Sequence, residues 1–166
     1  MTYLMLNIGL ALAWAALTGQ FNPANLAIGF VLGYATLFAA RRAIGPSSYF
    51  IKVRQVISFL GFFVWELILS NLRVAYDVLT PGLAVQPRIV AVPLDARTDL
   101  EITALSFLIS LTPGSLSLDV STDRRALFVH VMYAPDADVV RREIKNGLER
   151  RLLAVMRGVA PQEVPA

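Results

Sequence analysis

Residues 1–40 read MTYLMLNIGLALAWAALTGQFNPANLAIGFVLGYATLFAA and contain no Lys, Arg, Asp or Glu. The surface of an ordinary soluble fold needs charged side chains, so this stretch is expected to face something other than water. The first charges, Arg41 and Arg42, stand side by side where the apolar run stops. Paired basic residues at that place are typical of the end of a membrane segment. The stretch therefore predicts a membrane-embedded N-terminal half.

Two apolar helices are predicted within this half, at residues 3–19 and 25–41. Gly19, Asn22 and Pro23 between them indicate a tight turn, so the two helices should form an antiparallel hairpin. Each is near the short end of what spans a bilayer. Small residues such as Gly29 and Gly33 would let the helices approach closely, although this spacing alone is common in apolar segments. A cleaved signal peptide is the weaker interpretation, because a second apolar run follows directly.

A third helix is predicted at residues 55–79, after a short basic connection. Its first part is apolar and its last two turns are polar, so we expect it to start in lipid and to leave it. Pro81-Gly82 closes the membrane half, which spans residues 1–83. This half has five basic and two acidic residues, and therefore carries the whole net charge of +3. The excess is interpreted as the loop charge that orients membrane proteins.

Residues 84–160 are predicted to form a small α+β domain of order β-α-β-β-α, followed by a tail at 161–166. Short β-branched or alternating runs at 88–94, 116–121 and 127–133 predict strands. A helix over 100–111 is too short for a fourth span and is taken as a core helix, capped by Thr98 or Asp99. A last amphipathic helix runs from Asp136 to Gly158. The ten basic and ten acidic residues after position 83 balance, so a nucleic-acid-binding surface is not expected.

The candidate functional residues lie on the third helix: Glu66, Ser70, Asn71, Arg73 and Asp77. Glu66, Ser70, Arg73 and Asp77 are spaced by 4, 3 and 4 residues and so share one helix face, where Arg73 and Asp77 can pair. An ionised Glu66 in an apolar segment costs at least about 2.5 kcal/mol, so it is expected to face protein or water. Two interpretations stay open: a structural role, in contact with a partner subunit or reaching an interface, which is favoured, or handling of protons or cations.

Chemistry of other kinds is not expected. The chain has no cysteine and a single histidine, His130, which excludes thiolate sites and leaves no metal-ligating pattern. The common nucleotide-binding, metalloprotease and hydrolase motifs are absent. The basic residues of the last helix alternate with Glu143 and Glu149 and are interpreted as a solvated face, with a docking face for a partner or lipid headgroups as the alternative. The sequence therefore predicts neither an enzyme nor a cofactor or metal site.

Several short motifs together resemble one known family, the E subunit of Mrp-type multi-subunit sodium/proton antiporters. They are Leu17-Thr18-Gly19, Glu66-Leu67, Ser70-Asn71, Pro93-Leu94-Asp95, Asp99-Leu100-Glu101-Ile102-Thr103, Leu111-Thr112-Pro113-Gly114-Ser115-Leu116, Asp119-Val120-Ser121 and Val129-His130-Val131. The resemblance implies an accessory subunit of a large complex in the cell membrane. Its partners would include large antiporter-like subunits that carry the ion pathways, and the subunit itself would serve assembly and activity. The alternative is an independent membrane-tethered α+β module that binds or senses a ligand.

Two features of the sequence give opposite indications of the side of the membrane on which the α+β domain lies. The charges between Arg41 and Arg54 favour a cytoplasmic loop, and three full spans would then place the domain outside. The resemblance implies a cytoplasmic domain. Either the third helix does not fully cross, or the charge rule is overridden within the complex. We expect a cytoplasmic domain.

Overall fold

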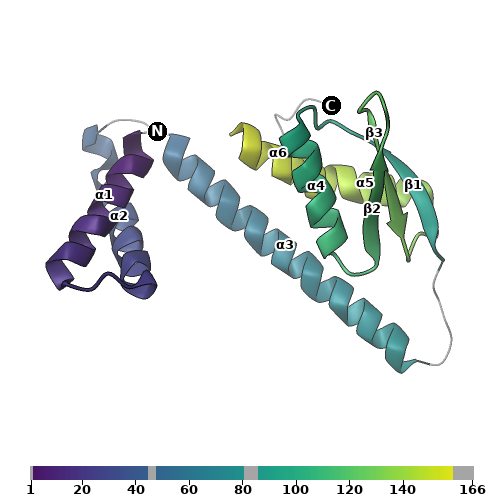
Figure 1. The fold of residues 1–166 in the computed structure, drawn as a ribbon, viewed down its shortest axis with the longest axis horizontal. Helices are drawn as coiled ribbons and strands as arrows, with labels where there is room; N and C mark the ends of the chain where they lie inside the picture. The colour runs from purple at the N-terminus through teal and green to yellow at the C-terminus, as the bar shows by residue number, and fades with distance from the viewer. Residues whose placement is uncertain (1, 45–47, 81–85, 159–166) are drawn as a thin grey trace. The chain divides into compact units, whose positions relative to one another are not determined.

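The computed structural model describes residues 2–44, 48–80 and 86–158 of the chain. These residues form two compact units, which divide between Arg54 and Gln55. The predicted fold class, apolar helices followed by a small α+β domain, is confirmed (Figure 1).

The first unit is a hairpin of helices α1 (Thr2–Thr18) and α2 (Pro23–Ile44). Neither helix carries a charge before Arg41, and most of their large apolar side chains are exposed. The helices approach closely where α2 has glycine. A Cβ atom on Gly29 would lie 3.0 Å from the Ala11 carbonyl oxygen, and one on Gly33 would overlap the amide oxygen of Asn7. The small residues therefore do bring the two helices together.

The polar groups of the hairpin are largely paired with one another. At the turn, the Trp14 indole nitrogen donates to Asn25 Oδ1 at 3.0 Å, and Asn25 Nδ2 donates to Thr18 Oγ1 at 2.7 Å. Near the other end, the fully buried Asn7 donates from Nδ2 to the Tyr49 hydroxyl at 2.8 Å. Apart from Asn7 Oδ1, which is buried without a hydrogen-bond partner among the described residues, such pairing is what an environment without water requires.

Helix α3 runs from Ser48 to Leu79, a length of 32 residues. It begins seven residues before the expected start at 55. The early start is explained by Tyr49 and Phe50 of the first turn, which form an aromatic cluster with Tyr34. The Tyr34 ring centroid lies 5.9 Å from that of Tyr49 and 5.5 Å from that of Phe50. Helix α3 is, like α2, long and apolar enough to cross a bilayer.

The second unit contains the rest of α3 and a three-stranded antiparallel sheet. The strands β1 (Arg88–Pro93), β2 (Ser115–Val120) and β3 (Ala126–Val131) are ordered β1-β3-β2. Helix α4 (Asp99–Leu111) packs on β2, and α5 (Ala137–Glu143) packs on β1 (Figure 1). The hydrophobic core lies between these helices and the sheet, around Val90, Val92, Leu105, Leu127 and Val129. The α4 segment is thus a core helix, as expected.

Local signals explain where these elements begin and end. Thr98 caps α4 through a capping box, in which its hydroxyl accepts from the Glu101 amide and the Glu101 carboxylate accepts from the Thr98 amide, each at 3.2 Å. Gly114, at φ +89°, makes the turn into β2, and Gly158, at φ +69°, ends the last helix.

The last helical stretch is less regular than expected. Between α5 and α6 (Arg150–Arg157) lies a π-helical turn, η1 (Ile144–Glu149). The extra residue in such a turn shifts the following side chains around the helix axis. Glu149 and Leu153 are consequently fully buried. Leu152 is buried as well, and Leu148 is half-buried.

Candidate functional site

The polar face of α3 extends further than the sequence predicts. Continuing the same 4-and-3 spacing from Asp77 back to Gln55 gives one stripe along the helix, here called the α3 stripe. Its members are Gln55, Phe59, Phe62, Glu66, Ser70, Arg73 and Asp77. All are half-buried except Arg73, which is exposed. Residues at this spacing share one side of a helix.

The α3 stripe contacts the chain's own α+β domain. Phe59 packs against the hydrophobic core of the domain. The guanidinium carbon of Arg151 lies 4.3 Å from the centroid of the Phe62 ring, a cation–π contact. Two turns of helix beyond Glu66, the guanidinium carbon of Arg73 lies 5.5 Å from the ring centroid of Tyr133. The stripe therefore meets the domain at both its ends.

Arg73 and Asp77 do not form the ion pair that their spacing allows. The ion pairs found among the described residues do not include them. Both instead contact Tyr133: Arg73 lies over its ring, and a hydrogen bond to Asp77 raises the pKa of the Tyr133 hydroxyl. The Tyr133 ring gives Arg73 a cation–π contact, and the Tyr133 hydroxyl gives Asp77 a hydrogen bond. These two contacts replace the ion pair that Arg73 and Asp77 could form with each other. No motif in the sequence singles out Tyr133 for this role.

Glu66 has a different environment. Its side chain is half-buried, and no hydrogen bond or ion pair joins it to another residue within 2–44, 48–80 or 86–158. Asn71 is exposed, and its Nδ2 donates to the Leu67 carbonyl oxygen at 2.7 Å. The structure thus brings Arg73 and Asp77 together around Tyr133, while Glu66 stays free to meet a group outside this part of the chain.

A network of charged side chains lies inside the α+β domain. Arg157 donates from Nε to Glu101 Oε1 at 2.8 Å and from a terminal nitrogen to the Asp95 carbonyl at 3.0 Å. The hydrogen bond from Arg157, helped by the Arg97 and Thr98 amides, lowers the pKa of Glu101 to about 2 despite its burial. Lys145 pairs with Asp95 at 2.9 Å. These pairs join α4, α6 and the segment between β1 and α4.

Glu149 is the least expected member of this network. Its sequence pattern predicts a solvated face, and this prediction is wrong, because its side chain is fully buried. One carboxylate oxygen accepts from the Asp95 and Ala96 amides at 2.7 and 3.0 Å, and the other has no partner among the described residues. Burial raises the pKa of Glu149, against the effect of those two hydrogen bonds. The η1 turn accounts for this position, and no periodic pattern in the sequence indicates it.

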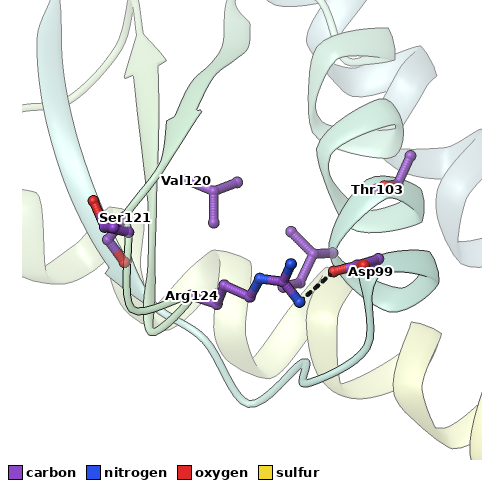
Figure 2. Close-up of a pocket in the computed structure, with 7 residues that line it drawn as sticks. Asp99, Thr103, Val120, Ser121 and Arg124 are labelled. Atoms are coloured by element: carbon purple, nitrogen blue, oxygen red, sulfur yellow. Dashed lines mark ion pairs between the residues drawn. The ribbon is translucent and has the colours of Figure 1, made fainter.

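An open pocket of about 380 Å³ lies between the start of α4 and the β2–β3 turn. Figure 2 shows Asp99 and Arg124 pointing toward one another across it, with an ion pair of 2.8 Å. The Asp99 and Arg124 side chains are 75% and 61% exposed, so the pair is well solvated and contributes little to stability. The pocket carries no arrangement of nucleophile and base that would make it a catalytic site.

The described part of the chain contains no group of three His, Cys, Asp or Glu residues that could hold a metal ion. His130 lies on the outer face of the sheet, in register with Ile89 of β1 and Leu116 of β2. Its neighbours are apolar rather than metal-binding.

Residues 7–155 match the family model described as "Na+/H+ ion antiporter subunit". The chain is 36% identical over 152 residues to the E subunit of the Na(+)/H(+) antiporter of Alkalihalophilus pseudofirmus, covering 92% of this chain and 96% of that protein. It is also 36% identical over 154 residues to the corresponding E subunit of Bacillus subtilis, covering 93% and 98%.

Two solved complexes contain similar chains. A chain of the membrane-bound sulfane sulfur reductase, an archaeal respiratory membrane complex, is 27% identical, with a TM-score of 0.56, and the match covers 92% of this chain and 98% of that one. A chain of the Mrp complex from a Dietzia species is 33% identical with a TM-score of 0.47, covering 59% of this chain and 92% of that one.

Proposed function

Because this chain belongs to the family of Na+/H+ antiporter E subunits, we propose that it serves assembly and activity of the antiporter complex without conducting ions itself. The observation that carries this proposal is the hairpin. Its helices have no ionisable side chain before Arg41 apart from tyrosine, and Asn7, Trp14, Thr18 and Asn25 are engaged with neighbouring residues. A path for cations or protons needs a series of polar groups with access to water, which this pairing does not provide.

The partners we propose are the other membrane subunits of the complex. The relatives are named as subunits, and one similar chain comes from a respiratory membrane complex. The apolar surface of the hairpin, including Leu17 at 86% and Phe21 at 67% exposure, has the character of a surface that meets lipid or other membrane helices. Glu66 is the residue proposed to meet a polar group of a partner. Asn71 is exposed on a different side of α3.

We also propose that the α+β domain lies in the cytoplasm. Arg41, Arg42, Lys52 and Arg54 surround the connection between α2 and α3, and such a basic cluster favours the cytoplasmic side for that connection. The domain lies on the same side if α3 does not fully cross the bilayer. The domain has balanced charge and no catalytic constellation in its described residues, which supports a role in contact rather than in chemistry.

The test compares the antiporter complex with and without this chain. Without it, we expect loss of the intact complex on native gels and loss of Na+-dependent proton flux in inverted vesicles. Vesicles that contain the chain alone, with insertion verified by carbonate extraction, should show no flux. Flux from the chain alone, or a fully active complex without it, would contradict the proposal. A solubilised particle no larger than the chain with its detergent would favour the independent tethered module.

A further inference from the structure

Helix α3 has two faces of opposite character. The α3 stripe faces the α+β domain, through Phe59, Phe62, Arg73 and Asp77. The opposite face is apolar and uncovered. Its exposed side chains are Leu60 at 53%, Val64 at 51%, Trp65 at 58%, Ile68 at 46% and Leu72 at 61%. Asn71 also lies within this face, and its amide nitrogen donates to the Leu67 carbonyl oxygen.

The contacts on the stripe are incompatible with α3 crossing the membrane in this part. The first contact is at Phe59 and the last at Asp77, and 18 residues of helix rise by about 27 Å. The hydrocarbon core of a bilayer is about 30 Å thick, so a crossing α3 would draw the α+β domain into lipid along this length. The chain from residue 84 onward carries ten basic and ten acidic residues, which cannot be accommodated there.

We infer that α3, from Gln55 to Leu79, lies in the plane of the membrane surface, with the α+β domain on its aqueous side and the face around Trp65 and Ile68 in the lipid. The large apolar residues on one face of this helix and the polar stripe on the other suit it to this position. Its polar side carries one basic residue, Arg73, and two acidic ones, Glu66 and Asp77, so apolar burial rather than attraction to headgroups holds it there. Trp65 belongs to the residue types that favour the membrane interface.

The chain leading into α3 supports lipid as the occupant of this face. The hairpin holds the chain in the membrane, and its aromatic cluster includes Tyr49 and Phe50 of the first turn of α3. The guanidinium carbon of Arg41 lies 4.1 Å from the Phe38 ring centroid within the same cluster. Aromatic and basic residues gathered in this way mark the level of the membrane interface. Helix α3 therefore starts at the interface.

This arrangement also removes the conflict over topology. With α3 on the surface, only α1 and α2 cross, and the basic connection at Arg41–Arg54 lies on the same side as the α+β domain. A cytoplasmic domain then needs no exception to the charge rule. The inference rests on the membrane location of the subunit, and it does not depend on whether the subunit conducts ions.

The test uses the absence of cysteine in the chain. Single variants Leu60→Cys, Val64→Cys, Ile68→Cys and Leu72→Cys, with Ser70→Cys as the matched control on the stripe, are spin-labelled in the whole complex in lipid nanodiscs. Depth is measured from accessibility to oxygen and to a water-soluble nickel reagent. We expect depth to vary with a period of 3.6 residues, with the first four sites at one common depth of about 5–10 Å. A depth that increases steadily through the midplane would overturn the inference, as would apolar-face sites shielded from both reagents by protein.

A second measurement is independent of depth. Ser48→Cys and Val78→Cys, at the two ends of α3, are labelled with a membrane-impermeant maleimide in inside-out and right-side-out vesicles. We expect both cysteines to be labelled in inside-out vesicles and neither to be labelled in right-side-out vesicles. Reaction of the two ends from opposite sides would show that α3 crosses. Antiport measured on the same variants reports separately on the accessory role.

Discussion

The hairpin and the α+β domain handle polarity in opposite ways. In the hairpin, the large apolar side chains lie mostly outside, and among the residues whose burial is described the fully buried polar side chain is that of Asn7, which donates to Tyr49. In the domain, a core of apolar side chains is buried and the charges lie mostly outside, apart from Glu149, Glu101 and its partner Arg157. Large apolar side chains such as Ile89, Leu116 and Phe128 are nevertheless exposed on the outer face of its sheet. The comparison teaches that the hairpin buries polar groups only when they are paired, whereas the domain has a core of its own and still leaves apolar surface uncovered. Helix α3 combines the two kinds of surface: its apolar face is exposed, and the α3 stripe on the other side faces the domain.

The largest expected effect of a single change is in the charged network of the domain. Arg157→Ala leaves the buried Glu101 carboxylate without its partner, which should destabilise the domain by about 2 kcal/mol. That is below the roughly 3–5 kcal/mol of a fully buried pair, because the Arg157 side chain is 24% exposed. Pulse proteolysis in urea on the full chain in detergent measures this. Arg124→Ala, in the exposed pair with Asp99, is the matched control and should change little. Equal effects would mean that burial does not distinguish the two pairs.

A second change tests the hairpin by overpacking. Gly33→Val should push α1 and α2 apart, since even a Cβ there overlaps Asn7, at a cost of about 1–3 kcal/mol. Gly9→Val is the control, because nothing lies within 4 Å of the corresponding position. The fraction of intact complex on native gels should fall for the first variant only. A normal yield with Gly33→Val would argue against close helix contact.

The two buried glutamates of the domain should respond to pH with opposite sign. The pKa of Glu101 falls from 4.5 to about 2 on folding, so its contribution is present above pH 4.5 and is lost as pH falls toward 2. The pKa of Glu149 is raised, so folding favours its protonated form. Stability therefore decreases as pH rises from 4.5 through the raised pKa, and it stays lower above it.

Glu149→Gln isolates the second of these effects. The amide oxygen can still accept from the Asp95 and Ala96 amides without a buried charge, so the variant should lose the decrease at higher pH. Near neutral pH it should be as stable as the parent chain or more stable by about 1 kcal/mol. Urea unfolding from pH 4 to 8 measures the difference. A variant that is less stable at every pH would show that the carboxylate is needed in its charged form.

Local signals were enough to predict much of this fold. The uncharged run to Ala40 and the capping box at Thr98 act within a few residues, and the alternating pattern of Leu127 and Val129 repeats along one strand. What could not be predicted depends on contacts across the chain. The Glu149 carboxylate is paired with amides more than 50 positions away, and Tyr133 meets Arg73 and Asp77 from another element. The early start of α3 depends likewise on aromatic contacts with the hairpin.

The smallest expected effect is at Glu66, and it tests the central claim that this subunit supports the complex without carrying ions. Glu66→Gln keeps a hydrogen-bonding side chain but cannot titrate, so a partner-facing role predicts a fully assembled complex with near-normal Na+-dependent proton flux. Glu66→Leu, the companion variant, should impair assembly by leaving a partner group unpaired at about 1–3 kcal/mol. The decisive measurement is proton flux per assembled Glu66→Gln complex in proteoliposomes. Retained flux is the predicted result, and an intact complex without proton-coupled activity would place this subunit in the ion path.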